Sequence, residues 1–156
     1  MDSLQETTIA TALKASINPI VVAALAIRDD VTLTNWLNTS SSVDAWKTTV
    51  PGNELFEGTN ITKFDNLTTG KRDAWRLMLD FAPINFSRIK FRTAVVDTWG
   101  NVDSLLILQD FTRKATRAEN FIGGNLETTN TVAALDLSFV GTLSVNDVSF
   151  ALNRNP

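Results

Sequence analysis

The chain has 156 residues, 44% of them hydrophobic, and a formal net charge of −3 at pH 7, which is enough apolar material for one compact core. It contains no histidine, cysteine or tyrosine, which removes the commonest general base and metal ligand, the thiol nucleophile and the phenolic acid. The acidic balance disfavours a sequence-independent nucleic-acid binder, because such proteins present a basic surface. We therefore expect no catalytic residue, no metal site, no cofactor and no direct contact with nucleic acid.

Residues 1–38 are predicted to form an N-terminal helical arm that docks onto a partner. The sequence SLQE at residues 3–6 matches a helix capping box, and apolar residues then recur every four positions over Ile9–Ile17. Pro19 ends or kinks this helix. The apolar run 20–27 that follows predicts a buried helix, too short to cross a membrane.

A polar connector, residues 39–42, separates this arm from a helical body that spans residues 43–156. Within the body, residues 43–50 predict a short extended segment, and residues 53–64 predict one or two helical turns. The clearest helix is predicted over residues 71–81, with charged residues on its solvent face. Its predicted buried face is formed by Ala74, Trp75, Met78, Leu79 and Phe81.

Residues 84–99 fit two patterns. Apolar residues alternate there as in a strand, yet Phe91, Val95 and Trp99 also stack at helical spacing. Gly100 just past the end favours a helix, which is our prediction. Residues 103–111 predict another helix.

The C-terminal part changes character. Residues 116–119, TRAE, match a second capping box, and residues 132–140 alternate as in a strand. Ser144 would cap a last helix. These patterns together predict a mainly α fold, a compact helical domain with one or two short β-strands near the C-terminus, including the strand over 132–140 and the final helix.

Candidate chemistry is sparse. Residues 65–72 resemble a phosphate-binding loop only in part, because Asp65 stands where glycine must bend the backbone and Arg72 where a hydroxyl must hold magnesium. An enzyme would have to be a carboxylate-only hydrolase with two acids of strongly shifted pKa in one pocket. The scattered acids that remain open for this role are Asp44, Glu54, Asp80 and Asp97.

Candidate interface residues are apolar, aromatic or basic. Tryptophans at both ends of the connector and arginine clusters on two helices suit protein interfaces, although a buried core and a solvated face are the simpler interpretations. The candidates are Ile20, Val21, Trp36, Trp46, Lys71, Arg72, Arg76, Arg113, Lys114 and Arg117.

Three segments resemble small structural proteins of tailed bacteriophages and prophages. They are residues 67–78 (LTTGKRDAWRLM), residues 115–121 (ATRAENF) and residues 139–148 (FVGTLSVNDV), the last running on to residues 151–153. Their order and spacing match across roughly the last 90 residues, and residues 43–64 match more loosely. Residues 84–99 depart from the family pattern, being more β-like.

This resemblance implies a non-enzymatic structural component of a tailed-phage virion, made in the bacterial host cytoplasm. It would act by subunit–subunit binding with other virion proteins, as a homo-oligomer within a larger assembly and away from membranes. A neck, head–tail connector or tail position is favoured over a capsid-decorating and stabilising role, because decoration proteins tend toward β-rich folds. A small regulatory phage protein absent from the particle is the further alternative.

Overall fold

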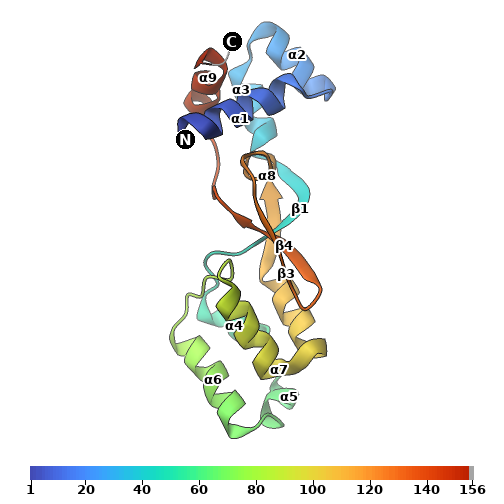
Figure 1. The fold of residues 1–156 in the computed structure, drawn as a ribbon, viewed down its shortest axis with the longest axis vertical. Coiled ribbons are helices and arrows are strands. Elements are labelled where there is room, and N and C mark those ends of the chain that lie inside the picture. Colours follow the sequence, from blue (N-terminus) through green and yellow to red (C-terminus); the bar gives the residue numbers. More distant parts are fainter. Residues whose placement is uncertain (155–156) are drawn as a thin grey trace. The chain divides into compact units, whose positions relative to one another are not determined.

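The computed structural model describes residues 1–154 (Figure 1). The helices are α1 (Ser3–Lys14), α2 (Pro19–Ile27), α3 (Asp30–Leu37), α4 (Gly52–Glu57), α5 (Ile61–Asp65), α6 (Thr69–Asp80), α7 (Ile89–Asp110), α8 (Arg117–Ile122) and α9 (Val145–Arg154). The strands are β1 (Ser40–Trp46), β2 (Thr112–Thr116), β3 (Gly124–Thr129) and β4 (Val132–Leu137).

The prediction of a mainly α fold with strands only near the C-terminus is wrong. Helices make up 59% of the chain, but 17% is strand, in a four-stranded mixed sheet of order β2-β1-β4-β3. β1 pairs with β4 in parallel, with Ala45 opposite Leu135. Such pairing joins segments about 90 residues apart, so local patterns along the sequence carry little sign of it.

The chain divides into two compact units. Unit 1 contains Met1–Val43, Lys114–Gly124 and the chain from Leu137 onward, and unit 2 contains Asp44–Arg113 and Asn125–Asp136. This differs from the predicted division into an arm, residues 1–38, and a body, residues 43–156. The boundaries fall within or at the ends of strands, so neither unit is a single stretch of sequence.

Unit 1 is a helical cluster in which α1 packs on α8 and α9. Asp2 and Gln5 form the capping box of α1, one residue earlier than predicted, and Ile9 and Leu13 are buried as expected. α9 begins after Ser144, whose side chain accepts from the Asp147 amide, and it buries Val148. The predicted caps therefore lie at or next to the observed helix ends.

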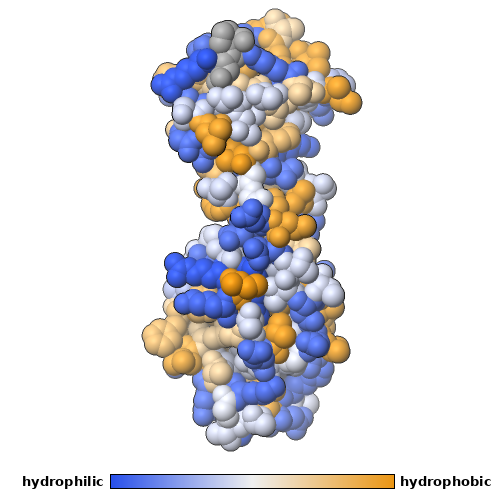
Figure 2. Space-filling view, viewed as in Figure 1, coloured by the Kyte–Doolittle hydropathy of each residue, from blue (hydrophilic) through white to orange (hydrophobic). Residues whose placement is uncertain are grey.

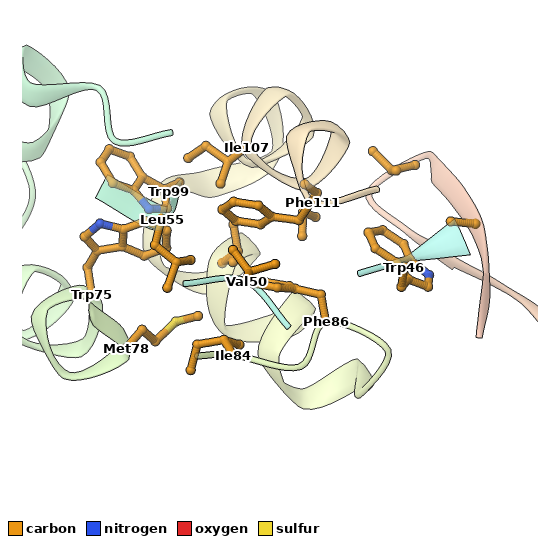
Figure 3. Close-up of a cluster of buried hydrophobic side chains, with 14 residues drawn as sticks. Trp46, Val50, Leu55, Trp75, Met78, Ile84, Phe86, Trp99, Ile107 and Phe111 are labelled. Atoms are coloured by element: carbon orange, nitrogen blue, oxygen red, sulfur yellow. The ribbon is translucent and has the colours of Figure 1, made fainter. Parts of the chain in front are cut away.

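Unit 2 is built around large aromatic side chains (Figure 3). Trp75 and Trp99 meet edge to face with ring centroids 5.3 Å apart, and Phe86 and Phe111 stack at 4.3 Å. Val50 pairs with Ile84 in an isolated antiparallel bridge, so the residues that were expected to begin a helix at 84 are extended instead. The helix itself begins at Ile89.

α7 is broken at one residue. Gly100 has φ +76° and ψ 172° inside the helix, a conformation that glycine adopts at little cost. The sequence placed a helix end at this glycine, followed by another helix over residues 103–111. That prediction is confirmed, since both flanking segments are helical and Gly100 is not.

One hairpin turn and one predicted connector form part of the sheet region. Asn130 and Thr131, both with positive φ, connect β3 to β4 as a two-residue hairpin turn requires. The segment 39–42, predicted to be an irregular connector, instead opens β1 at Ser40. Serine side chains gave no strand pattern there, because the pairing partner and not the local sequence selects the extended backbone.

Among residues 1–154, no single helix is both long and apolar enough to cross a bilayer. α1 and α2 meet that length and composition only as a pair, and they are bent by 110° at the break between them.

Candidate interaction surfaces

An apolar groove lies between α6 and α7 in unit 2. It consists of two cavities of about 410 and 390 Å³ that share Leu77, Met78 and Phe91 as walls. We call it the α6–α7 groove. Its other lining residues are Ala74, Phe81, Pro83, Ile84, Asn85, Arg88, Lys90, Ala94, Asp97 and Thr98.

The groove arises because the apolar stripe of α6 is wider than the core needs. Trp75 and Met78 turn into the core of unit 2. Ala74, Leu77 and Phe81 follow the i, i+3, i+7 spacing of a neighbouring face, so they lie beside the core-facing stripe. Phe81 is 71% exposed and Leu77 55% exposed. The sequence analysis assigned Ala74 and Phe81 to the buried face, and that assignment is wrong.

Charged side chains of both signs line the groove. Phe81 and Arg88 line one cavity, and Ala74 and Asp97 line the other, so α6 and α7 run antiparallel along it. Arg88 and Lys90 lie near the start of α7, and Asp97 lies two turns further along the same helix. The groove is therefore apolar along its floor, with Arg88 and Lys90 toward the start of α7 and Asp97 further along, and Lys90 and Asp97 line the same cavity.

A second uncovered apolar surface is α2 in unit 1. The helix has the sequence PIVVAALAI, and only Val21 and Ala24 are buried. The outward residues are apolar and exposed, and Figure 2 shows apolar colour gathered over this helix. We call this surface the α2 ridge, formed by Ile17, Ile20, Val22, Ala23, Ala26 and Ile27.

Residues 20–27 are helical as predicted, but the prediction that this helix is buried on all sides is wrong. Ile17 is 94% exposed and Ile27 77% exposed. A helix that is apolar all round normally has neighbours on every side. α2 packs mainly on α3 and α1, and the ridge residues face solvent.

No family model matches the chain, and no curated protein or solved structure shows significant similarity to it. The resemblance to small phage structural proteins therefore stays a prediction.

The predicted interface residues are divided between surface and core. Ile20 lies on the α2 ridge, whereas Val21 and Trp46 are buried within the chain and offer no surface to a partner. Trp36 is half-buried, stacked on Phe121 with ring centroids 5.9 Å apart.

The first basic cluster lies on α6. Lys71 and Arg76 are exposed and Arg72 is half-buried. Arg76 lies 5.7 Å from the centre of the Phe64 ring and 3.9 Å from Asp73, both in its own unit. The cluster therefore lies largely in solvent, on the same helix as the groove wall but outside the residues that line the groove.

The second basic cluster makes contacts between helices and strands of its own chain. Lys114 donates to the Ser42 carbonyl at 3.2 Å. Arg117 donates to the Trp36 carbonyl, also at 3.2 Å, and its guanidinium carbon lies 4.8 Å from the Trp36 ring centre. Arg113 is half-buried in β2. These interactions stabilise the fold of this chain around Trp36.

The sequence analysis missed Arg92, which the structure buries completely in unit 2. One of its terminal nitrogens donates to the carbonyls of Phe86 and Ser87, both at 2.6 Å, and the guanidinium carbon lies 4.7 Å from the Trp46 ring centre. Glu127 lies 3.3 Å away. Its spacing in the sequence could have shown this burial. Positions 92, 95 and 99 share one face of α7, and Val95 and Trp99 are core residues.

Burial lowers the pKa of Arg92, and the negative charges of Glu127 and Asp136 oppose that shift. A cavity of about 360 Å³ beside it is lined by Arg88 and Lys90 but also by these two carboxylates. The cavity mixes basic and acidic side chains, and the Arg92 guanidinium already has protein partners. Arg92 therefore fixes the 86–87 loop and the β3 strand.

Two of the four acids left open for catalysis have described surroundings, and Asp29 is a helix cap. Glu54 is ion-paired with Lys47, and Asp97 lines the apolar groove. Asp29 caps α3, and hydrogen bonds from Thr32 lower the pKa of Asp29. Within residues 1–154, no three acidic side chains gather in a way that could hold a metal ion. The arrangement that the chain offers is apolar contact surface.

Proposed function

We propose that this protein is a structural component of a tailed-phage virion that acts by binding other protein subunits. The observation that carries the proposal is the pair of uncovered apolar surfaces, the α6–α7 groove and the α2 ridge. Large exposed apolar surfaces on soluble proteins usually mark sites of protein or ligand contact. The sequence resemblance described above supplies the virion context.

The proposal does not include a position within the virion. The neck or tail was favoured because decoration proteins tend toward β-rich folds and this chain was expected to be mainly helical. The mixed four-stranded sheet removes that reason.

Mass spectrometry of gradient-purified particles of the phage that encodes this chain tests the proposal. We expect the chain to copurify with particles at a fixed ratio to the major capsid protein. Six or twelve copies would place it at the portal vertex or tail, and hundreds would place it on the shell. Absence from washed particles, while the chain is present in infected cells, would overturn the proposal in favour of a regulatory protein.

A matched pair of variants connects the surface to the role. Leu77→Glu places a charge on the floor of the groove, and Leu106→Glu places the same charge at an equally exposed leucine outside both surfaces. We expect particles assembled with Leu77→Glu to lose the chain, and particles with Leu106→Glu to retain it. Equal retention of both variants would remove the groove from the proposal.

A further inference from the structure

We propose that the occupant of the α6–α7 groove is the α2 ridge of a second copy of this chain. The inference deepens the proposed function and rests on it for its biological setting, because it names the partner of the same groove. Each copy carries one groove and one ridge, so the contact would be heterologous and each copy would bind two neighbours.

The shape of α2 suits the groove. A nine-residue helix is about 13 Å long, and the groove follows α7 from Arg88 to Thr98, a rise of about 15 Å. Ile20, Ala23 and Ile27 follow the i, i+3, i+7 spacing by which a helix places apolar anchors in a groove. Ala23 and Ala26 are small, which lets the backbone of α2 come close to the groove floor.

The chemistry of α2 also suits the groove. The helix has no charged residue between Pro19 and Ile27, so docking would remove no charged side chain of α2 from water. The groove floor is formed by Leu77, Met78 and Phe91, and it would present no buried charge in return. Burial of apolar area on both sides favours such a contact.

The charges set the direction of docking. α2 ends at Arg28, Asp29 and Asp30, which together carry one net negative charge next to the negative end of the helix dipole. These suit the part of the groove near Arg88 and Lys90. The N-terminus of α2, with its positive dipole end, would then lie near Asp97. We infer that α2 runs antiparallel to the α7 segment of its neighbour.

Sedimentation velocity on the full chain, from about 1 to 500 μM, tests this contact. The wild type should associate as its concentration rises. Leu77→Glu places a charge in the groove, and Ile20→Asp places a charge on the ridge. Each variant alone should sediment as a monomer, with its affinity for self-association reduced at least tenfold. Leu106→Glu and Leu4→Glu are matched exposed controls on other surfaces, and they should associate as the wild type does.

Mixing the two broken variants gives the decisive result. Leu77→Glu keeps an intact ridge and Ile20→Asp keeps an intact groove, so a one-to-one mixture should form a dimer and grow no further. Circular dichroism spectra like that of the wild type would show that both variants are folded. A mixture that stays monomeric, or a single variant that associates as strongly as the wild type, would overturn the inference.

The two proposals fail separately. A wild type that stays monomeric at every concentration, yet copurifies with virions, would overturn the docking of α2 in the groove and leave the virion role standing. A chain that associates as described, but is absent from particles, would support the contact and overturn the virion role.

Discussion

The core of unit 2 contains five large aromatic rings among its aliphatic residues, whereas the buried core of unit 1 contains only aliphatic residues and alanine. Arg92 in unit 2 and Glu119 in unit 1 are charged side chains with at most 1% of their surface exposed. Arg92 is a donor to two carbonyls. Glu119 accepts from the amides of Thr116 at 2.8 Å and Gly141 at 2.9 Å.

The comparison shows that the buried charge fixes irregular backbone in both units. Loop carbonyls need a donor, and Arg92 supplies several from one planar group. Loop amides need an acceptor, and a carboxylate supplies two oxygens. In both cases the charged group holds backbone at a loop or at the end of an element, Phe86 and Ser87 for Arg92 and Thr116 and Gly141 for Glu119, so its removal should affect these segments of its own unit first.

The two units can be followed separately in solution. Trp36 lies in unit 1, and Trp46, Trp75 and Trp99 lie in unit 2. Labelling with 5-fluorotryptophan and urea titration by fluorine NMR would therefore report the unfolding of both units in one sample. The predictions below use this measurement.

The largest effect is expected from Arg92→Met. Methionine fills much of the volume but leaves the carbonyls of Phe86 and Ser87 without a donor, which should lower the free energy of unfolding of unit 2 by about 3–5 kcal/mol. Arg76→Met, an exposed control, should change it by less than about 0.5 kcal/mol. If the urea midpoint reported by Trp36 falls as far as the midpoints reported by the other three tryptophans, the two units unfold together. That result would contradict a separate role for Arg92 in unit 2.

A smaller effect is expected from Glu119→Gln in unit 1. The amide keeps one acceptor oxygen but turns an NH₂ group toward a backbone donor, which should lower the free energy of unfolding of unit 1 by about 1–3 kcal/mol. The Trp36 resonance should report the loss and the other three should not. An unchanged Trp36 midpoint would mean that the buried carboxylate is dispensable.

Ser144→Ala should cost about 1 kcal/mol, again in unit 1, because it removes the hydroxyl that accepts from the Asp147 amide at the start of α9. Ser149→Ala lies within the same helix and is the control. An equal loss of unfolding free energy for the two serine variants would show that helix propensity, and not the cap, sets the stability of α9.

The smallest effect concerns pH. Hydrogen bonds from Ser144 lower the pKa of Asp147 below its ordinary value, and the positive N-terminus adds to this. Because the folded-state pKa is the lower one, Asp147 stabilises unit 1 above pH ~4, and this contribution is lost as the pH falls through the folded-state pKa. The stability difference between the wild type and Asp147→Asn should therefore shrink between pH 5 and 3. A stability difference that stays constant between pH 5 and 3 would contradict the lowered pKa of Asp147.

Helix ends were predictable from the sequence, whereas sheet pairing was not. The capping box at Thr116 and Glu119 is present as expected, and the one at α1 is displaced by a single residue. Caps are local, since a side chain meets an amide three residues away. β1 and β2 contain serine, threonine and basic residues, and they are strands because of partners distant in sequence.

The interaction surfaces were only partly predictable. The apolar run of α2 was visible, and so was its position in a segment expected to dock. Its burial was misjudged because the sequence shows which residues are apolar and not how many neighbours the fold provides. The groove was hidden for a related reason, since Leu77 and Phe81 look like core residues until the width of the core is known.

The packing of α1 against α9 has a consequence for synthesis on the ribosome. Unit 2 has all its residues once Asp136 has emerged, but unit 1 lacks a wall of its core until α9 follows. During translation, the inner face of α1, with Ile9 and Leu13, therefore stays only partly covered until α9 is made more than a hundred residues later. Nascent chains should accordingly expose this face to trigger-factor-like chaperones, and they should release it only after α9 has folded.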